Sequence, residues 1–309
     1  MYANVTMDCQ KSASAGMASD LNWKRDAPSW PNSTHSQFVD AGGLRWHVQV
    51  VGSGPVVLLV HGTGASTHSW RGVIADLAPH FTVVAPDLPG HGFTERLPDA
   101  QMTLHGMAQA LAVLIGAINL EPSIAVGHSA GAPVVMRTAI DGGIRPRAII
   151  SLNGALLPFR GVAGQVFKPL AKFLALQPFL PRFFAWRATS RSAVERLLEG
   201  TGSRPSPEDV ALYARLFQSP SHVGATLAMM ANWDLAPLLR DLPTLKTAVT
   251  LVAGQSDRAI PSSDAVAAAK YLHNAEIVEL PGLGHLAHEE DPTLISRLIE
   301  RRAGLAKNN

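Results

Sequence analysis

Short runs of apolar residues, each bounded by turn-forming residues, recur along most of this chain. Residues 56–60 form such a run, which starts after Gly52-Ser53-Gly54-Pro55 and ends before His61-Gly62. A strand buried on both faces of a parallel sheet has this pattern, because helices cover both of its faces. Comparable runs occur at residues 82–85, 123–126, 148–152, 249–253 and 276–280. The pattern therefore predicts a mostly parallel central sheet.

Segments with helical periodicity alternate with these predicted strands. The clearest covers residues 103–118, where Leu104, Met107, Leu111 and Leu114 share one helical face. Strand–helix alternation of this kind predicts an α/β fold, with a doubly wound sheet and helices on both of its faces.

The sequence also predicts the first strands of the sheet and one break in the alternation of strands and helices. Residues 38–40 and 44–51 predict two strands, antiparallel to each other, which brings the sheet to about eight strands. The alternation stops after residue 154, where a long stretch is helical in character and rich in Phe, Leu, Pro and Arg. The predicted organisation is a flexible leader at residues 1–35, a core at residues 36–154 and 236–309, and a helical cap or lid at residues 155–235.

The pentapeptide Gly127-His128-Ser129-Ala130-Gly131 lies between a predicted strand and a helix-like segment. This is the G-x-S-x-G pattern of a nucleophile elbow, in which a tight turn holds the serine side chain over the sheet edge. Glycines flank the serine because a Cβ would clash where the strand and the helix nearly touch. The pattern predicts that Ser129 is a nucleophile, and an ordinary turn serine is the alternative.

A serine hydroxyl needs an adjacent base, and the base needs a carboxylate that holds its tautomer. In the elbow fold these residues follow in the order Ser, Asp or Glu, His. Asp257 and His285 each come directly after a predicted strand, so they lie at the same sheet edge as Ser129. We predict a triad of these three residues, with a turn role for Asp257 and a structural role for His285 as alternatives. Asn153 follows another strand but cannot serve as the acid.

Two backbone N–H groups are needed to stabilise the oxyanion that forms during acyl transfer. We assign one to Ala130, which follows the nucleophile at the start of a helix, and the other to Thr63 in the loop after residue 60. The neighbouring Gly62 and Gly64 allow a close approach of the backbone.

The other histidines near these motifs have structural interpretations. His61, His91 and His128 are expected to hold turns through side-chain hydrogen bonds. The run His285-Leu286-Ala287-His288 lacks the H-E-x-x-H spacing of a zinc site, and the loop at residues 61–65 lacks the Gly-Lys-Ser/Thr of a P-loop. The sequence therefore indicates no metal site and no organic cofactor.

The predicted cap contains an aromatic and basic segment with two open interpretations. In the first, its apolar face packs on the core as a lid. In the second, it lines a wide apolar pocket for a large hydrophobic substrate, and its basic residues meet carboxylates or a membrane surface. Trp70 and Trp233 are expected as pocket walls, with core packing as the alternative. The segment contains Phe167, Lys168, Leu170, Lys172, Leu174, Arg182, Arg187 and Arg191.

Composition narrows the functional classes. With 26 Lys and Arg against 24 Asp and Glu, the net charge of +2 is too small to predict nucleic-acid binding. The single cysteine, Cys9, excludes an internal disulfide and a cysteine metal cluster. No apolar run reaches the roughly 18 residues of a transmembrane helix, and residues 1–20 lack the pattern of a signal peptide. We expect a cytoplasmic protein, with Met17 as an alternative start and peripheral membrane contact left open.

Over residues 36–303 the chain resembles the α/β-hydrolases, which implies an eight-stranded, mostly parallel sheet with a helical cap insertion. The resemblance rests on His61-Gly62, the elbow, Gly284-His285 and residues 87–92 and 254–261. Further stretches resemble the magnesium-chelatase accessory hydrolases of bacteriochlorophyll biosynthesis, the BchO proteins. They are Trp30-Pro31-Asn32 and residues 41–49, 61–70 and 85–94.

The second resemblance implies a role near the insertion of Mg²⁺ into protoporphyrin IX, with magnesium-chelatase subunits as partners. It does not supply a reaction. An apolar, Phe-rich cap with scattered Arg and Lys suits a tetrapyrrole that bears propionates or their methyl ester, and this substrate is a hypothesis. Dehalogenases and epoxide hydrolases of this fold carry Asp at the elbow, so Ser129 argues against both. Three hypotheses remain: a serine hydrolase acting on an ester or related acyl bond, a non-catalytic tetrapyrrole-binding or chelatase accessory protein, and a general carboxylesterase.

Overall fold

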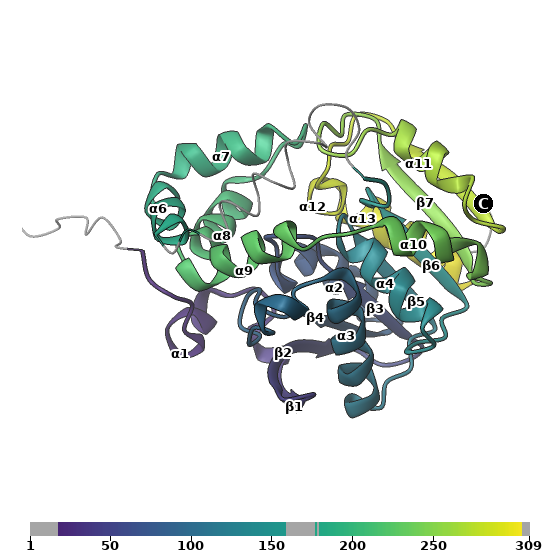
Figure 1. The fold of residues 1–309 in the computed structure, drawn as a ribbon, viewed down its shortest axis with the longest axis horizontal. Helices are drawn as coiled ribbons and strands as arrows, with labels where there is room; N and C mark the ends of the chain where they lie inside the picture. Colours follow the sequence, from purple (N-terminus) through teal and green to yellow (C-terminus); the bar gives the residue numbers. More distant parts are fainter. Residues whose placement is uncertain (1–17, 159–176, 178, 305–309) are drawn as a thin grey trace, which may run out of the picture.

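The computed structural model describes residues 18–158, 177 and 179–304 of the chain (Figure 1). An eight-stranded sheet forms its centre. The strands are β1 (Ser36–Ala41), β2 (Leu44–Val51), β3 (Val56–Val60), β4 (Thr82–Pro86), β5 (Ile124–His128), β6 (Ala148–Leu152), β7 (Ala248–Gly254) and β8 (Ala275–Leu280). Each coincides with a predicted strand to within two residues at either end.

The strand order in the sheet is β1-β2-β4-β3-β5-β6-β7-β8. β1 pairs antiparallel with β2, and β2 pairs antiparallel with β4. The other neighbouring pairs are parallel. The predicted α/β architecture, including the antiparallel first pair, is confirmed. The consequence for function is that β5, β6, β7 and β8 all end at one edge of the sheet.

Helices cover both faces of the sheet. The core helices are α2 (Arg71–Leu77), α3 (Leu104–Ile118), α4 (Gly131–Ile140), α10 (Ala236–Asp241), α11 (Ser263–Ala269), α12 (Ala287–Glu290) and α13 (Pro292–Ala303). α2 packs on α13, and α3 packs on α4. In β3, Leu58 and Val60 belong to the apolar core under α3 and α4, whereas Val57 and Leu59 belong to the core under α2 and α13. Burial on both faces is why this strand is an uninterrupted apolar run.

The segment between β6 and β7, which we call the helical insertion (residues 155–235), contains four described helices. They are α6 (Leu180–Arg187), α7 (Arg191–Glu199), α8 (Pro207–Phe217) and α9 (Pro220–Ala231). Figure 1 shows them in teal and green as a lobe at one end of the molecule, beyond the sheet. No helix in the described ranges has the length and hydropathy needed to cross a bilayer. Cys9, Met17, Phe167, Lys168, Leu170, Lys172 and Leu174, which were considered above, lie outside the described residues.

The prediction of an unstructured leader over residues 1–35 is wrong for the part of it that the structure describes. α1 (Trp23–Asp26) forms there, and Trp30 is buried. The carboxylate of Asp26 pairs with the guanidinium of Arg215, in α8, at 2.9 Å. This segment has no apolar period of its own. Its order depends on contacts with a helix far away in the sequence, which a local pattern cannot reveal.

Candidate active site

Ser129 occupies the tight turn between β5 and α4. Its φ of 49° lies in the left-handed region, which is strained for a residue with a Cβ. Both flanking glycines are required by close contacts. A Cβ on Gly127 would lie 2.5 Å from the backbone nitrogen of Ala132, and one on Gly131 would lie 2.3 Å from the carbonyl oxygen of Val60. The turn is therefore a nucleophile elbow in geometry as well as in sequence.

The structure brings Ser129, Asp257 and His285 together. Nε2 of His285 lies 3.0 Å from Oγ of Ser129, and Nδ1 of His285 lies 2.8 Å from Oδ2 of Asp257. The three residues come from the loops after β5, β7 and β8, which meet at the carboxyl edge of the sheet. When Nδ1–H is donated to the carboxylate, the lone pair of Nε2 faces the hydroxyl. A general base needs this arrangement.

The carboxylate of Asp257 is fully buried and held by several donors. Nδ2 of Asn153 donates to Oδ2 at 2.7 Å, and the backbone N–H groups of Ala259 and Ile260 each donate to Oδ1 at 2.8 Å. These donors offset the cost of burying the charge and fix the orientation of the carboxylate. The supporting role of Asn153 was missed from the sequence. Its position directly after β6, the strand next to β7, is the signal that could have found it.

The loop between α7 and α8 holds both triad loops in place. The carbonyl of Thr201 accepts the N–H of Arg258 at 2.9 Å, and Oγ of Ser203 accepts the N–H of Leu286 at 2.8 Å. These two donors directly follow the triad aspartate and histidine in the sequence. The helical insertion therefore contributes to the geometry of the triad itself.

The loop after β3 passes directly over the elbow. A Cβ on Gly62 would lie 2.9 Å from Cβ of Ser129, so glycine permits this approach. His61 fixes the path of the loop. Its Nδ1–H donates to the carbonyl of Gly62 at 2.8 Å, and its Nε2 accepts the backbone N–H of Leu88 at 2.9 Å.

Thr63 and Ala130, the predicted oxyanion-hole residues, both line the cavity beside Ser129. Ala130 is the N-cap of α4, where backbone N–H groups and the positive end of the helix dipole favour negative charge. The hydroxyl of Thr63 donates to Sδ of Met229 at 3.9 Å. The main-chain N–H of Thr63, rather than its hydroxyl, therefore stays our candidate for binding an oxyanion.

Other histidines near the motifs hold turns, as predicted. Nδ1–H of His91 donates to the carbonyl of Pro89 at 3.2 Å, and Nε2–H of His128 donates to the carbonyl of His285 at 2.9 Å. Burial lowers the pKa of His61, His91 and His128 below the ordinary value of 6.5. These side chains are neutral at pH 7, and they make their hydrogen bonds in the neutral form.

A buried polar cluster lies behind the triad. The ring of His288 lies 4.4 Å from the rings of both His128 and Trp70, measured between centroids. The hydroxyl of Tyr213 donates to Oε1 of Glu289 at 2.8 Å. Burial lowers the pKa of His288 to about 3 and raises the pKa of Glu289 well above its ordinary value. His288 is thus neutral at pH 7, and Glu289 keeps its proton to a higher pH than an exposed carboxyl does.

We expect the free energy of unfolding to fall less with rising pH in Glu289→Gln than in the wild type. Above an ordinary carboxyl pKa of 4.5, the unfolded chain releases a proton that the folded protein keeps. The contribution of Glu289 to the free energy of unfolding is therefore at its full value below that pH, and it declines as the pH rises towards the raised pKa. Gln accepts the same Tyr213 hydrogen bond and does not titrate. Thermal unfolding between about pH 5 and pH 8 measures the effect, with the exposed Glu195→Gln as control. Equal pH dependence in Glu289→Gln and wild type would contradict it.

A cavity of about 770 Å³ opens beside Ser129 and His285. Small-molecule sites span about 300–1,000 Å³, so this is a large one. Most of its lining is apolar, and α6, α7, α8 and α9 build much of the wall. Apart from the triad histidine, Arg187 is the one ionisable side chain among the described lining residues. The large apolar groups on the wall include Leu157, Phe184, Phe217, Leu227, Met230 and Trp233.

The two tryptophans expected as pocket walls have different positions. Trp233 lines the cavity. Trp70 does not, and the expectation that it would is wrong. Its side chain is 0% exposed and packs in the apolar core under α2 and α13. The physical reason is that Trp70 directly precedes α2, whose buried face is turned towards the sheet.

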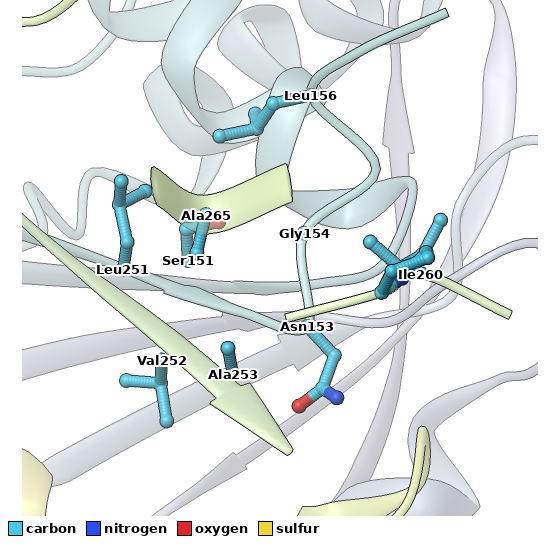
Figure 2. A pocket seen from close by; sticks show the side chains of 10 residues that line it. Ser151, Asn153, Gly154, Leu156, Leu251, Val252, Ala253, Ile260 and Ala265 are labelled. Atoms are coloured by element: carbon cyan, nitrogen blue, oxygen red, sulfur yellow. The ribbon is translucent and has the colours of Figure 1, made fainter. Parts of the chain in front are cut away.

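A second pocket, of about 10 Å³, lies where β6 and β7 end (Figure 2). Ser151, Asn153 and Ile260 are among its lining residues. Its volume suits one water molecule at most, so it is no substrate site. Within the described ranges, no group of three or more His, Cys, Asp or Glu side chains is arranged to hold a metal ion.

Comparison with known proteins agrees with this geometry. A model of the alpha/beta hydrolase family matches residues 57–298. The chain belongs to the alpha/beta hydrolase family. This alpha/beta hydrolase is 39% identical over 273 residues to the magnesium-chelatase 30 kDa subunit of Rhodobacter capsulatus. The aligned region covers 88% of this chain and 95% of the relative. The resemblance predicted from the motifs is confirmed.

More distant relatives have other names. The hydrolase is 29% identical over 281 residues to haloalkane dehalogenase 2 of Mycobacterium tuberculosis, covering 87% of the chain and 95% of the relative. The solved structure of the epoxide hydrolase CorEH superimposes with a TM-score of 0.76 at 23% identity, over 88% of this chain and 99% of that one. The second likeness shows the fold alone. The family model and the dehalogenase relative support hydrolase activity without specifying which bond is cleaved.

Proposed function

We propose that this hydrolase cleaves an ester or related acyl bond with Ser129, His285 and Asp257 as its catalytic residues. The observation that carries the proposal is the 3.0 Å contact between Nε2 of His285 and Oγ of Ser129, on the wall of a large cavity. A hydroxyl nucleophile activated by an imidazole base suits attack on an acyl carbon.

The geometry supports a two-step reaction. Nε2 of His285 takes the hydroxyl proton as Oγ of Ser129 bonds to the carbonyl carbon, and the N–H groups of Thr63 and Ala130 bind the oxyanion. The ester C–O bond then breaks, and His285 gives the proton to the departing alcohol. In the second step water attacks the acyl carbon and loses a proton to His285; the bond between that carbon and Oγ of Ser129 then breaks, and His285 returns the proton to Oγ. The products are an alcohol, a carboxylic acid and free Ser129.

For the substrate we propose a tetrapyrrole that bears propionate or propionate-ester groups. The 770 Å³ apolar cavity suits a large flat ring system, and Arg187 on its wall suits a carboxylate. The 39% identity to a protein named as a magnesium-chelatase subunit supports the same class. We extend the proposal to a role in bacteriochlorophyll biosynthesis near the chelatase step, with chelatase subunits as partners.

We expect protoporphyrin IX and its dimethyl ester to bind at micromolar concentration. Porphyrin fluorescence quenching measures both affinities, and Ser129→Ala protein prevents turnover during the titration. Arg187→Gln is expected to weaken binding of the free acid about five- to tenfold, because it removes a charge-assisted hydrogen bond. Its effect on the dimethyl ester is expected to be small.

Arg182→Gln is the matched control, since Arg182 is exposed on the same helix and does not line the cavity. Absence of binding by both porphyrins would remove the tetrapyrrole from the proposal and leave the serine chemistry standing. Equal losses of affinity for the acid and the ester in Arg187→Gln would contradict the proposed contact between Arg187 and a carboxylate.

A second candidate function is a non-catalytic tetrapyrrole-binding or chelatase accessory role. The named chelatase relative favours it, because that name describes a subunit and no hydrolytic step. A pigment-forming strain that carries Ser129→Ala separates the two. Loss of pigment favours the enzyme, and full complementation favours the accessory role. Fast turnover of short-chain esters without porphyrin affinity would instead identify a general carboxylesterase.

A further inference from the structure

Large apolar side chains are exposed together on one part of the helical insertion. Phe179 and Trp186 are each 61% exposed, Phe183 is 48% exposed and Phe184 is 38% exposed. The ring centroid of Phe183 lies 5.7 Å from that of Phe184 and 6.0 Å from that of Trp186. We call these four residues the α6 aromatic patch. Contiguous exposed apolar groups of this kind mark interaction sites, whereas single ones are ordinary.

The charges within the segment that carries the α6 aromatic patch have one sign, with Asp20 from the N-terminal segment near Arg182. Residues 179–194 contain three arginines, Arg182, Arg187 and Arg191, and no Asp or Glu. All three are exposed. The whole chain carries a net charge of only +2, so this concentration is local. Aromatic groups interleaved with arginines are typical of segments that lie in the interface of an anionic bilayer.

The patch also borders the cavity. Phe184 and Arg187 line the cavity wall and are exposed to solvent as well. Figure 1 shows α6 at the outer end of the lobe formed by the helical insertion, away from the sheet. A hydrophobic ligand dissolved in a bilayer could therefore reach the cavity at this helix without crossing bulk water.

We infer that the α6 aromatic patch docks on an anionic lipid surface and that hydrophobic ligands enter the cavity from that surface. The alternative occupant is a second copy of the chain. Two copies meeting through this face would bring two arginine clusters together, which opposes association. The inference concerns a surface and stands independently of the proposed ester chemistry.

Co-sedimentation with lipid vesicles tests the inference. One set of vesicles is phosphatidylcholine alone, and the other contains equal parts of phosphatidylcholine and phosphatidylglycerol. We expect binding to the anionic vesicles to exceed binding to the neutral ones at least about tenfold, and to fall as salt rises. The double variant Phe183→Ser/Trp186→Ser leaves the cavity-lining Phe184 and Arg187 unchanged. It is expected to bind anionic vesicles at least about tenfold more weakly than the wild type.

Val266→Ser/Leu294→Ser is the matched control, because these exposed apolar side chains lie on α11 and α13, away from the patch. It is expected to bind vesicles like the wild type, and far-UV circular dichroism checks that each variant is folded. Failure of the full chain to bind anionic vesicles would overturn the inference, as would unchanged binding by the patch variant. A dimer in light scattering that the patch variant abolishes, without vesicle binding, would assign the patch to a second copy instead.

Discussion

Replacing Ser129 by Ala is expected to lower the turnover of an activated ester on the order of 10⁴- to 10⁶-fold. The change removes Oγ, the atom that we propose bonds to the substrate, and leaves the hydrogen bond between His285 and Asp257 in place. The backbone at this position is strained at a φ of 49° for Ser and Ala alike, so the fold is expected to persist. Steady-state hydrolysis of p-nitrophenyl esters measures the change.

Ser263→Ala is the control for this experiment, since Ser263 is exposed at the start of α11, away from the cavity. Its turnover is expected to match that of the wild type. Residual turnover in Ser129→Ala within tenfold of the wild type would show that another group performs the hydrolysis.

Asp257→Asn is expected to lower the same turnover about 10⁴-fold while preserving the fold. The backbone N–H groups of Ala259 and Ile260 both donate to Oδ1, so the amide oxygen of Asn takes that position. The NH₂ group then replaces Oδ2, where it faces Nδ1 of His285 and also the amide of Asn153, whose oxygen must turn towards it to accept. The imidazole must accept at Nδ1 and carry its proton on Nε2, where it can no longer take the proton of Ser129.

The wrong tautomer predicts a particular pH dependence for Asp257→Asn. Its residual turnover is expected to rise with hydroxide concentration, because solvent base replaces the imidazole. Asn153→Asp is the comparison variant. It keeps Asp257 but replaces the amide of Asn153, which donates to Oδ2 of Asp257 in the wild type, with a second carboxylate. An Asp257→Asn enzyme with full turnover at neutral pH would show that the carboxylate has no part in orienting His285.

The sheet could be predicted from the sequence because its central strands are buried on both faces. Each strand is then a short uninterrupted apolar run, and its two ends are marked by turn residues. The grouping of the three candidate catalytic residues followed from the same argument. Parallel strands place the loops after β5, β7 and β8 at one edge, so Ser129, Asp257 and His285 could be placed together without knowledge of any side-chain contact.

The features that the sequence pattern did not reveal depend on contacts between distant segments. The order of α1 depends on the pair formed by Asp26 and Arg215, and the support of Asp257 depends on Asn153. Polar residues of this kind have no periodicity to read. Trp70 was misplaced for a related reason, because an aromatic residue has the same local sequence signal on a pocket wall and in a core.

The helical insertion connects the different parts of the proposed function. Thr201 and Ser203 hold the loops that carry the triad, while neighbouring helices build the cavity. The same helices carry the α6 aromatic patch. Changes in the insertion are therefore expected to affect the triad geometry as well as ligand access.

Labelling with a fluorophosphonate probe tests the central claim, that Ser129 is an activated nucleophile. The probe bonds through phosphorus to an activated serine Oγ, fluoride leaves, and intact mass spectrometry counts the adducts without any assumption about the substrate. We predict one adduct per chain in the wild type and in Ser263→Ala, and none in Ser129→Ala. A folded wild-type protein that takes up no probe, or a Ser129→Ala protein that is still labelled, would contradict the claim.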